Sequence, residues 1–313
     1  MSDLQEWKSA RIPVCLGGSV FGWLISARES EAVLDRFFEI GGRFIDTSDA
    51  YSYAQRSDGL DSESIIGGWA QRNGVSGELR ICTKVGLCPG LRDLRPKTVR
   101  TAVLRSRDRL GVPMLEAVLA HADDETTPAE DVAGALSSVW GVEARHVGVC
   151  SFSAGRLSAT LTEGKRLGLA PLELIQEEFS LAARSFETSE LCVLAESQNL
   201  TLMCTVALAQ GFLTGKFRNA TERVGHRQRL VAERYPGARF DRILDTLQTV
   251  AAGHGVSMAA AALRWLVDHP RSVLPVASVT APSQLEAFRQ ASEISLGGSD
   301  WTILESVSAP LRA

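Results

Sequence analysis

The chain has 313 residues, of which 45% are hydrophobic and 22% are charged, and its formal net charge is −4. This composition is typical of a globular protein rather than a disordered one. The slight excess of acid excludes a general positive field, so we expect neither a nucleic-acid partner nor a membrane partner.

Targeting signals and metal-binding patterns are absent from the sequence. No run approaches the ~18 apolar residues that a membrane-spanning helix needs, and the first residues lack the pattern of a signal peptide. The six cysteines form no C-x-x-C pair, and the five histidines contain no i,i+4 pair. We therefore predict reduced thiols, no metal site and a cytoplasmic location.

Short apolar runs alternate with longer segments of helical periodicity along the whole chain, which is typical of βα units on a parallel sheet. Eight candidate strands can be counted, at residues 12–17, 43–47, 79–85, 115–121, 146–151, 173–179, 200–206 and 273–278. Eight such units that close on themselves form a (β/α)8 TIM barrel of the α/β class. Since barrels of this length are routinely one domain, we predict a single domain over residues 1–313.

Helix signals lie between the strand candidates. Thr127 and Pro128 predict a helix start after the fourth strand, with Thr127 as the capping residue and Pro128 in the first helical position. Residues 257–268 have strong helical periodicity, and Pro270 ends that helix. Residues 241–251 predict a further helix.

One long stretch, from 211 to about 239, has no clear pattern and follows the seventh strand. From 216 to 239 it holds seven Lys and Arg residues against two Glu residues. Irregular segments of this length in compact domains usually have a functional reason. Two interpretations remain open, a solvated loop and a loop that cradles an anion.

Polar side chains end three successive strands. The segment 43–51 delivers Asp46 to a strand end and Tyr51 to the loop beyond, and the next two strands end at Lys84 and His121. Because the carboxyl ends of parallel strands meet at one face of a barrel, we expect these four side chains to converge there. Each of them alone has a structural explanation, such as a helix cap or a core histidine. The four together predict a catalytic site.

This set of side chains suits the reduction of a carbonyl, which places a proton on the oxygen while hydride reaches the carbon. Tyr51 is a suitable proton donor if its pKa, ~10 in its unperturbed state, is pulled toward working pH. The Lys84 ammonium would favour the phenolate, and Asp46 would hold that lysine charged. His121 can donate a hydrogen bond to the substrate oxygen.

The quartet, in this order, resembles the catalytic tetrad of the aldo-keto reductases, and other motifs agree over nearly the whole chain. Residues 17–22 resemble the opening loop of that family, 61–67 its S-E-x-x-I-G helix, 83–86 its T-K-V-G strand end and 121–124 an H-x-D-D variant found in one bacterial branch. The segment 211–216 is similar to the G-F-L-T-G-K loop. The resemblance implies a barrel enzyme that reduces an aldehyde or ketone with NADPH, including sugar or secondary-metabolite intermediates.

The resemblance also implies a set of contacts with the cofactor. In relatives the loop matched by 211–216 crosses the diphosphate. Positions that match the family's cofactor-binding residues are Gly18, Ser19, Asp46, Cys150, Ser151, Gln176, Thr205, Leu208, Gly211, Leu213, Gly215, Lys216, Ser278, Thr280 and Gln284.

Several of these positions depart from the family pattern. Cys150 and Ser151 stand where the G-x-S-N motif hydrogen-bonds the nicotinamide carboxamide, and Phe179 replaces the tyrosine of Q-x-x-Y-N. Thr205 stands where relatives carry an aromatic ring stacked on the nicotinamide. The loss of the stacked ring and the loss of one amide contact would each cost on the order of 1–3 kcal/mol. Residues 278–280 read S-V-T, where many relatives have a G-x-R arginine for the 2′-phosphate of NADPH.

Three functions remain open from the sequence. The first is an NADPH-dependent reductase, with NADH as the other nucleotide. In the second, the nicotinamide site has degenerated and the tetrad catalyses a dehydration, cyclisation or elimination without a nucleotide. The third is a redox-sensing subunit similar to the potassium-channel β proteins. Barrel specificity depends on the loops after each strand, so the small-molecule substrate and the oligomeric state are left open.

Overall fold

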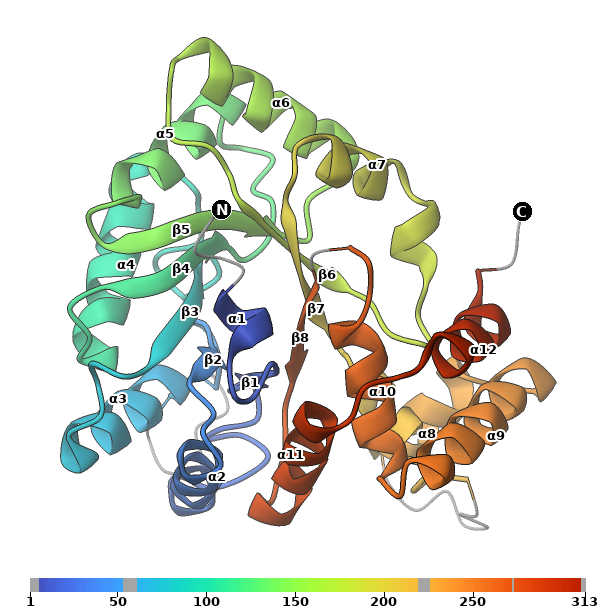
Figure 1. Ribbon diagram of the computed structural model, residues 1–313. Coiled ribbons are helices and arrows are strands. Elements are labelled where there is room, and N and C mark those ends of the chain that lie inside the picture. The colour runs from blue at the N-terminus through green and yellow to red at the C-terminus, as the bar shows by residue number, and fades with distance from the viewer. Residues whose placement is uncertain (1–5, 53–60, 219–225, 272, 311–313) are drawn as a thin grey trace.

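Eight strands form a closed barrel in the computed structural model, which describes residues 6–52, 61–218, 226–271 and 273–310 (Figure 1). Each strand pairs in parallel with the next, and β1 pairs with β8. The strands are β1 Cys15–Gly17, β2 Phe44–Asp46, β3 Arg80–Val85, β4 Leu115–Ala120, β5 Ala144–Cys150, β6 Leu174–Glu178, β7 Thr201–Thr205 and β8 Val273–Ala277. The predicted (β/α)8 TIM barrel is confirmed.

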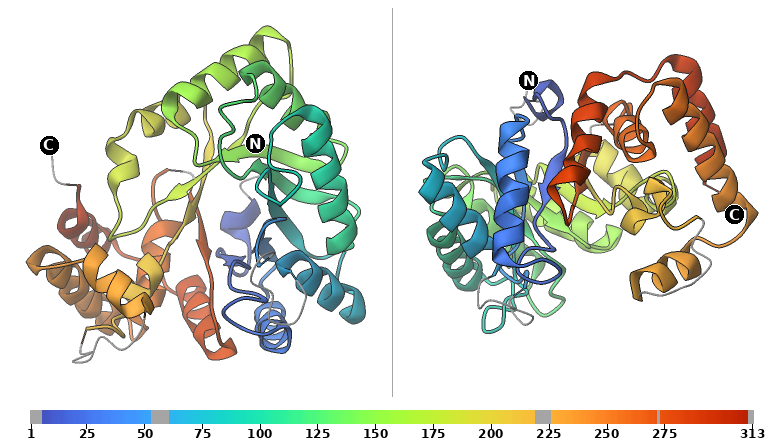
Figure 2. Two further views of the ribbon diagram at one scale, coloured as in Figure 1. Left: turned by 180° about the vertical axis from the view of Figure 1, so that it is seen from behind. Right: turned by 90° about the horizontal axis from the view of Figure 1, so that it is seen from below.

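One short helix, α1, precedes β1, and the other helices follow the strands and surround the barrel. The helices are α1 Glu6–Ser9, α2 Ala27–Glu39, α3 Ser62–Asn73, α4 Pro96–Leu110, α5 Ala129–Val139, α6 Ala154–Arg166, α7 Glu190–Ser197, α8 His226–Arg234, α9 Ala238–Gly253, α10 Met258–Val267, α11 Glu286–Glu293 and α12 Gly298–Ser308. Among the described residues, the short 3-10 helices are η2 Ser185–Thr188, η3 Ala209–Thr214 and η4 Pro282–Leu285. The blue and cyan helices cover one side of the barrel and the orange helices cover the opposite side (Figure 2).

The helix after β4 begins one residue later than the sequence predicts, at Ala129, and Thr127 is not its cap. No side chain caps α5, and Pro128 occupies the N-cap position. The Thr127 hydroxyl instead donates to Asp124, whose carboxylate also accepts from Thr126 and from the Leu94 amide. An ionised carboxylate is a stronger acceptor than a hydroxyl, so it gathers the loop's donors. The α10 prediction is confirmed, with Ser257 accepting from the Ala260 amide at 3.2 Å.

The stretch 211–239 is not irregular throughout, which corrects the prediction. It contains part of η3 and all of α8, although 219–225 lie outside the described residues, Glu222 and Arg223 among them. Val231 and Tyr235 are buried, and the Tyr235 ring stacks on Phe212 at 4.9 Å between centroids. Because so few apolar residues dock α8, its periodicity in the sequence is weak.

The barrel has two apolar layers. The inner layer comes from the inward side chains of the strands, among them Phe44, Leu174 and Met203, and Trp7 of α1 packs against it. The outer layer lies between strands and helices. Polar side chains enter the interior at the carboxyl ends of two neighbouring strands, where Asp46 ends β2 and Lys84 lies one residue from the end of β3.

Membrane and metal features are limited in the described part of the chain. No single helix there is long and apolar enough to cross a membrane, and only the pair α9 and α10, bent by 93°, meets the length and composition required. The described residues include no group of three His, Cys, Asp or Glu side chains placed to hold a metal ion. All six cysteines are buried free thiols.

Candidate active site

A buried ion pair lies at the centre of the site. Lys84 is 1% exposed, and its Nζ donates to Asp46 Oδ1 and Oδ2, each at 2.7 Å, and to the Thr47 carbonyl at 2.8 Å. Burial alone would lower the pKa of Lys84, but the Asp46 charge outweighs burial and raises it above its usual value. The lysine is therefore a permanent cation, as the sequence predicts.

Tyr51 lies beside this cation, in the loop after β2. Lys84 Nζ is 4.9 Å from the centre of the Tyr51 ring. Burial raises the pKa of Tyr51, and the Lys84 charge and hydrogen bond oppose that rise without cancelling it. The predicted lowering of the tyrosine pKa is thus wrong for this structure. Burial destabilises the phenolate more than the Lys84 charge stabilises it. The phenol stays protonated, which is the form that gives up a proton.

His121 completes the group at the end of β4. Its ring lies edge-on to Tyr51, with 5.5 Å between centroids, and its Nδ1 is 2.8 Å from Ser48 Oγ. Burial and the Lys84 charge lower the pKa of His121 to about 3. The imidazole is therefore neutral near pH 7 and carries a single N–H.

Gln176 on β6 has one buried side-chain oxygen without a hydrogen-bond partner among the described residues. Its Nε2 donates to Asp46 Oδ1 at 3.0 Å, which fixes the orientation of the amide because a carboxylate only accepts. Its Oε1 is buried and has no hydrogen-bond partner among the described residues, although Gln176 lines the cavity. A buried acceptor of this kind fits an amide N–H₂ donor such as that of a nicotinamide carboxamide.

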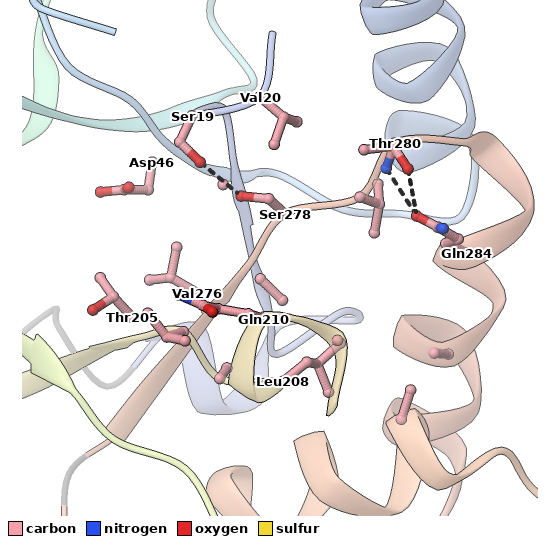
Figure 3. Close-up of a pocket in the computed structure, with 18 of the residues that line it drawn as sticks. Ser19, Val20, Asp46, Thr205, Leu208, Gln210, Val276, Ser278, Thr280 and Gln284 are labelled. Carbon is pink, nitrogen blue, oxygen red and sulfur yellow. Dashed lines mark hydrogen bonds between the residues drawn. The ribbon is translucent and has the colours of Figure 1, made fainter. Parts of the chain in front are cut away.

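All four tetrad residues line one cavity of about 720 Å³, large enough for a dinucleotide. The predicted cofactor positions that also line it are Ser19, Asp46, Cys150, Ser151, Gln176, Thr205, Leu208, Gly211, Lys216, Ser278, Thr280 and Gln284. Asp46 and Thr205 lie at one end of the cavity, and Thr280 and Gln284 lie at the other (Figure 3). The fold therefore brings most of the predicted cofactor-binding positions to one cavity.

Three predicted cofactor residues do not line the cavity. Gly18 packs against α3, where an added Cβ would come within 2.7 Å of Ser62 Oγ. Leu213 is fully buried in the outer apolar layer. Gly215 ends η3 with φ 75°, and a Cβ there would meet Met258 at 2.7 Å. These residues shape the loops, and their neighbours face the cavity.

The cavity wall beside Gln176 Oε1 carries small side chains. Cys150 Sγ lies 3.4 Å from Ser151 Oγ, and the Ser151 amide donates to Glu177 at 3.0 Å. Thr205 ends β7 and is partly exposed to the cavity. Within the described part of the chain, this section of the wall therefore offers no aromatic face for a ring, in keeping with Thr205 in place of the family's aromatic residue.

Phe179 is not part of this rim. It is fully buried in an aromatic cluster, with its ring 5.6 Å from Trp265 and 5.2 Å from His269 between centroids. The loss of a hydroxyl at this position relative to the family motif therefore has no bearing on the cavity.

The opposite end of the cavity is polar. There Gln284 Oε1 accepts from the Thr280 amide at 2.8 Å, while between the two ends Ser19 Oγ and Ser278 Oγ lie 3.2 Å apart (Figure 3). Glu286 also lines this end, and its carboxylate pairs with Arg289. Uncharged donors and one acidic group thus take the place of the family arginine.

The loop after β7 is strained where it borders the cavity. Val206 has φ 55°, Gln210 has φ 57° and Gly211 has φ 95°. A β-branched residue at positive φ is a genuine outlier, of a kind that clusters at ligand sites. Lys216 lines the cavity beyond this loop, whereas Arg218 pairs with Asp245 on α9. One cation of the basic stretch therefore lines the cavity and another is paired with α9, while the two interpretations of the stretch both stay predictions.

Further lining residues escaped the sequence analysis. Strand ends supply some, and a rule that counts each strand's last residue and its successor would have found them. Others come from the start of α10 and from α11, which only the tertiary fold brings to the cavity. They are Gly17, Val20, Val206, Ala207, Gln210, Thr214, Ser257, Ala259, Val276, Ala277, Val279, Ser283, Glu286, Ala287 and Gln290.

A second polar cluster lies behind the tetrad. Asp49 is 3% exposed, and its Oδ2 has no hydrogen-bond partner among the described residues. Burial, reinforced by the nearby Glu63 carboxylate, raises the pKa of Asp49 to about 7. Glu63 itself is paired with Arg109 and accepts from Thr83 at 2.5 Å. Asp49 is therefore a buried acid that is largely protonated below neutral pH.

Comparison with known proteins gives one consistent family. The model described as "Aldo/keto reductase family" matches residues 13–309. The aldo-keto reductase yakc of Schizosaccharomyces pombe, whose name includes NADP(+), is 25% identical over 303 residues, which are 93% of this chain and 85% of the relative.

Two further relatives show the range of functions among similar chains. Aflatoxin B1 aldehyde reductase member 4 of Homo sapiens is 29% identical over 285 residues, which cover 85% of this chain and 82% of the relative. A probable voltage-gated potassium channel subunit beta of Oryza sativa is 25% identical over 278 residues, with 85% and 82% covered.

Proposed function

This chain belongs to the aldo/keto reductase family and is an oxidoreductase, and from that premise we propose that it reduces an aldehyde or ketone with NADPH through Asp46, Tyr51, Lys84 and His121. The observation that carries the proposal is the buried Lys84–Asp46 pair beside a protonated Tyr51, all open to one large cavity. The substrate is a small molecule that enters the same cavity. Carbonyl-bearing sugars and secondary-metabolite intermediates belong to this class of substrate.

Each side chain has a distinct role in this reaction. Tyr51 gives its proton to the carbonyl oxygen as negative charge develops there, and Lys84 stabilises the phenolate that remains. Asp46 keeps Lys84 charged and in place. His121, neutral because its pKa is about 3, donates a hydrogen bond to the same oxygen.

The nicotinamide supplies the hydride when it is bound, and the chain's own residues hold it. Gln176 Oε1 would accept from its carboxamide, and Lys216 would lie along the diphosphate. The NADP(+) in the name of one relative supports NADPH. Since the far end of the cavity offers hydroxyl and amide donors without an arginine, we expect only a modest preference over NADH.

A fluorescence titration of NADPH tests the cofactor. We expect micromolar affinity, and Lys216→Ala should weaken it about tenfold, the effect of one charge-assisted hydrogen bond. Lys165→Ala, on the exposed face of α6, is the matched control and should leave the affinity unchanged.

Turnover then separates the three functions. Oxidation of NADPH by aliphatic and aromatic aldehydes and ketones should be fast and should require Tyr51. Feeble NADPH binding together with Tyr51-dependent conversion of a hydroxy-carbonyl compound in the absence of nucleotide would favour elimination chemistry. Tight binding with very slow turnover would favour a redox-sensing subunit.

A further inference from the structure

Ser48 lies directly behind His121 and does not line the cavity. It follows β2 in the loop that carries Tyr51, and it is fully buried. Its Oγ is 2.8 Å from His121 Nδ1, across a separation of 73 residues. A buried hydroxyl at this distance from a ring nitrogen is in a position to choose which nitrogen carries the proton.

The Ser48 hydroxyl has one hydrogen to donate and two lone pairs. One lone pair accepts from the Ala50 amide at 3.1 Å. The hydrogen has three acceptors in range, namely His121 Nδ1 at 2.8 Å, the Lys84 carbonyl at 3.2 Å and Asp49 Oδ1 at 3.5 Å.

The His121 ring is the best of these acceptors. The Lys84 carbonyl already accepts from the Asp49 amide at 3.0 Å. Asp49 Oδ1 lies at the outer limit of hydrogen-bond distance and, below its pKa of about 7, belongs to a neutral carboxyl. The Lys84 carbonyl has a second lone pair, so distance decides between the acceptors, and the contact with His121 Nδ1 is the shortest of the three.

The consequence for His121 follows from its charge. A neutral imidazole has one N–H, and the partner at one nitrogen decides where that hydrogen lies. If Nδ1 accepts from Ser48, the hydrogen must be on Nε2. Because Ser48 blocks Nδ1 from the interior side, Nε2 is the ring nitrogen left for a ligand in the cavity that His121 lines.

We propose that Ser48 is a positioning residue that holds His121 in the Nε2–H tautomer, so that the neutral ring donates to the carbonyl oxygen of the substrate. The proposal rests on the proposed function for its catalytic consequence, but the tautomer itself is a property of the free protein. In the opposite tautomer, an Nε2 lone pair would face the lone pairs of the carbonyl and repel it.

The first test reads the tautomer without any substrate. In protein labelled with ¹⁵N-histidine, the His121 signals are identified by their loss in His121→Asn, among five histidines in all. We expect Nε2 at the shift of a protonated ring nitrogen and Nδ1 at that of an acceptor. The reverse assignment in the unmodified protein overturns the proposal.

The second test removes and restores the hydroxyl. Ser48→Ala should shift both ring signals toward a mixture of tautomers and lower kcat roughly 5- to 30-fold, with NADPH affinity unchanged. Ser48→Thr keeps the donor and should recover the spectrum. Unchanged ring signals in Ser48→Ala contradict the proposal whatever the activity, and if that variant does not fold, the spectrum of the unmodified protein still decides.

The control variant removes another buried serine hydroxyl, one that does not contact His121. Ser30 on α2 is fully buried and donates to the Ser26 carbonyl at 2.8 Å, outside the cavity. Ser30→Ala should leave the His121 spectrum and kcat as they are. Absence of any carbonyl reduction by the unmodified protein would count against the proposed function, while the tautomer measurement would stand independently.

Discussion

The cavity has two sides that are built in different ways. At the ends of β2, β3 and β4, charged and polar side chains are buried and bonded to one another, as in the contacts of Lys84 with Asp46 and of His121 with Ser48. At the ends of β5 to β8 the wall consists of small, uncharged side chains such as Thr205 and Ser278, with a strained turn at Val206. The proposed reacting groups, on what we call the catalytic side, are thus fixed by the fold before any ligand arrives. On the opposite wall, which we call the recognition side, small uncharged side chains would contact the ligand.

The difference has an energetic cause. A charge taken out of water must find its partners inside the protein, so each member of the catalytic side is held by the others. A hydroxyl or thiol at the opposite wall needs no such network. Substitutions on the two sides should therefore differ in kind as well as in size.

The largest expected effect tests the chemistry of the catalytic side. Tyr51→Phe removes the only phenol in the group and should lower kcat by roughly 10²–10⁴, with NADPH affinity unchanged. Steady-state kinetics with a fixed aldehyde measures it, alongside the fluorescence titration. Turnover within a factor of a few of the unmodified enzyme would remove Tyr51 from its proposed role.

The next effect asks whether the catalytic side is also part of the core. Lys84→Met leaves the Asp46 carboxylate buried without its cation and should lower the free energy of unfolding by about 3–5 kcal/mol. The double variant Lys84→Met/Asp46→Asn removes both charges and should recover most of that loss. Urea denaturation measures both, and a loss below about 1 kcal/mol in the single variant would contradict the comparison.

A pH-dependent effect of up to about 4 kcal/mol belongs to Asp49. Its pKa is about 7 in the folded chain and ~3.9 when unfolded, so folding takes up a proton between these values. Stability from this group is full below about pH 4 and is lost as the pH rises through 7. Asp49→Asn should therefore gain stability relative to the unmodified protein between pH 5 and pH 8.

Urea denaturation at both pH values measures this difference. Asp108→Asn, at an exposed carboxyl on α4, is the control for the loss of a carboxyl outside the buried cluster. A difference between Asp49→Asn and the unmodified protein that does not change with pH would contradict the prediction.

The smallest expected effect lies on the recognition side. Thr205→Tyr supplies a ring face at the end of β7 and should raise NADPH affinity by roughly 2- to 10-fold, the value of one aromatic stack. Thr205→Val serves as the control without a ring. No gain from the tyrosine would indicate that this wall has been rebuilt for another ligand, and would narrow the contrast between the two sides.

The sequence predicts the catalytic side better than the recognition side, for physical reasons. Short apolar strands that end in Asp46, Lys84 and His121 mark their own carboxyl ends, and the parallel barrel brings those ends together. The local sequence pattern does not show how deeply Tyr51 is buried, so the predicted direction of its pKa shift is wrong. The Ser48 contact joins segments 73 residues apart and has no local signal.

The recognition side depends more on tertiary packing. Glu286 reaches the cavity from α11, a helix whose apolar stripe says only that it covers the barrel. Gly18 and Gly215 match family positions but serve close packing, because an added Cβ would collide with Ser62 or Met258. A motif therefore identified the correct loops, while the choice of residues that face the cavity required the structure.

The closed ring of strands also governs how this enzyme can be altered in the laboratory. Changes at the ends of β2 to β4 strike the interior ion pair, so most members of a random library there would lose the barrel along with the activity. A library confined to Cys150, Ser151, Thr205 and Ser278 varies the opposite wall, where no buried charge depends on them. Selection for new carbonyl substrates should therefore begin on that wall, because foldability there stays nearly constant while the ligand changes.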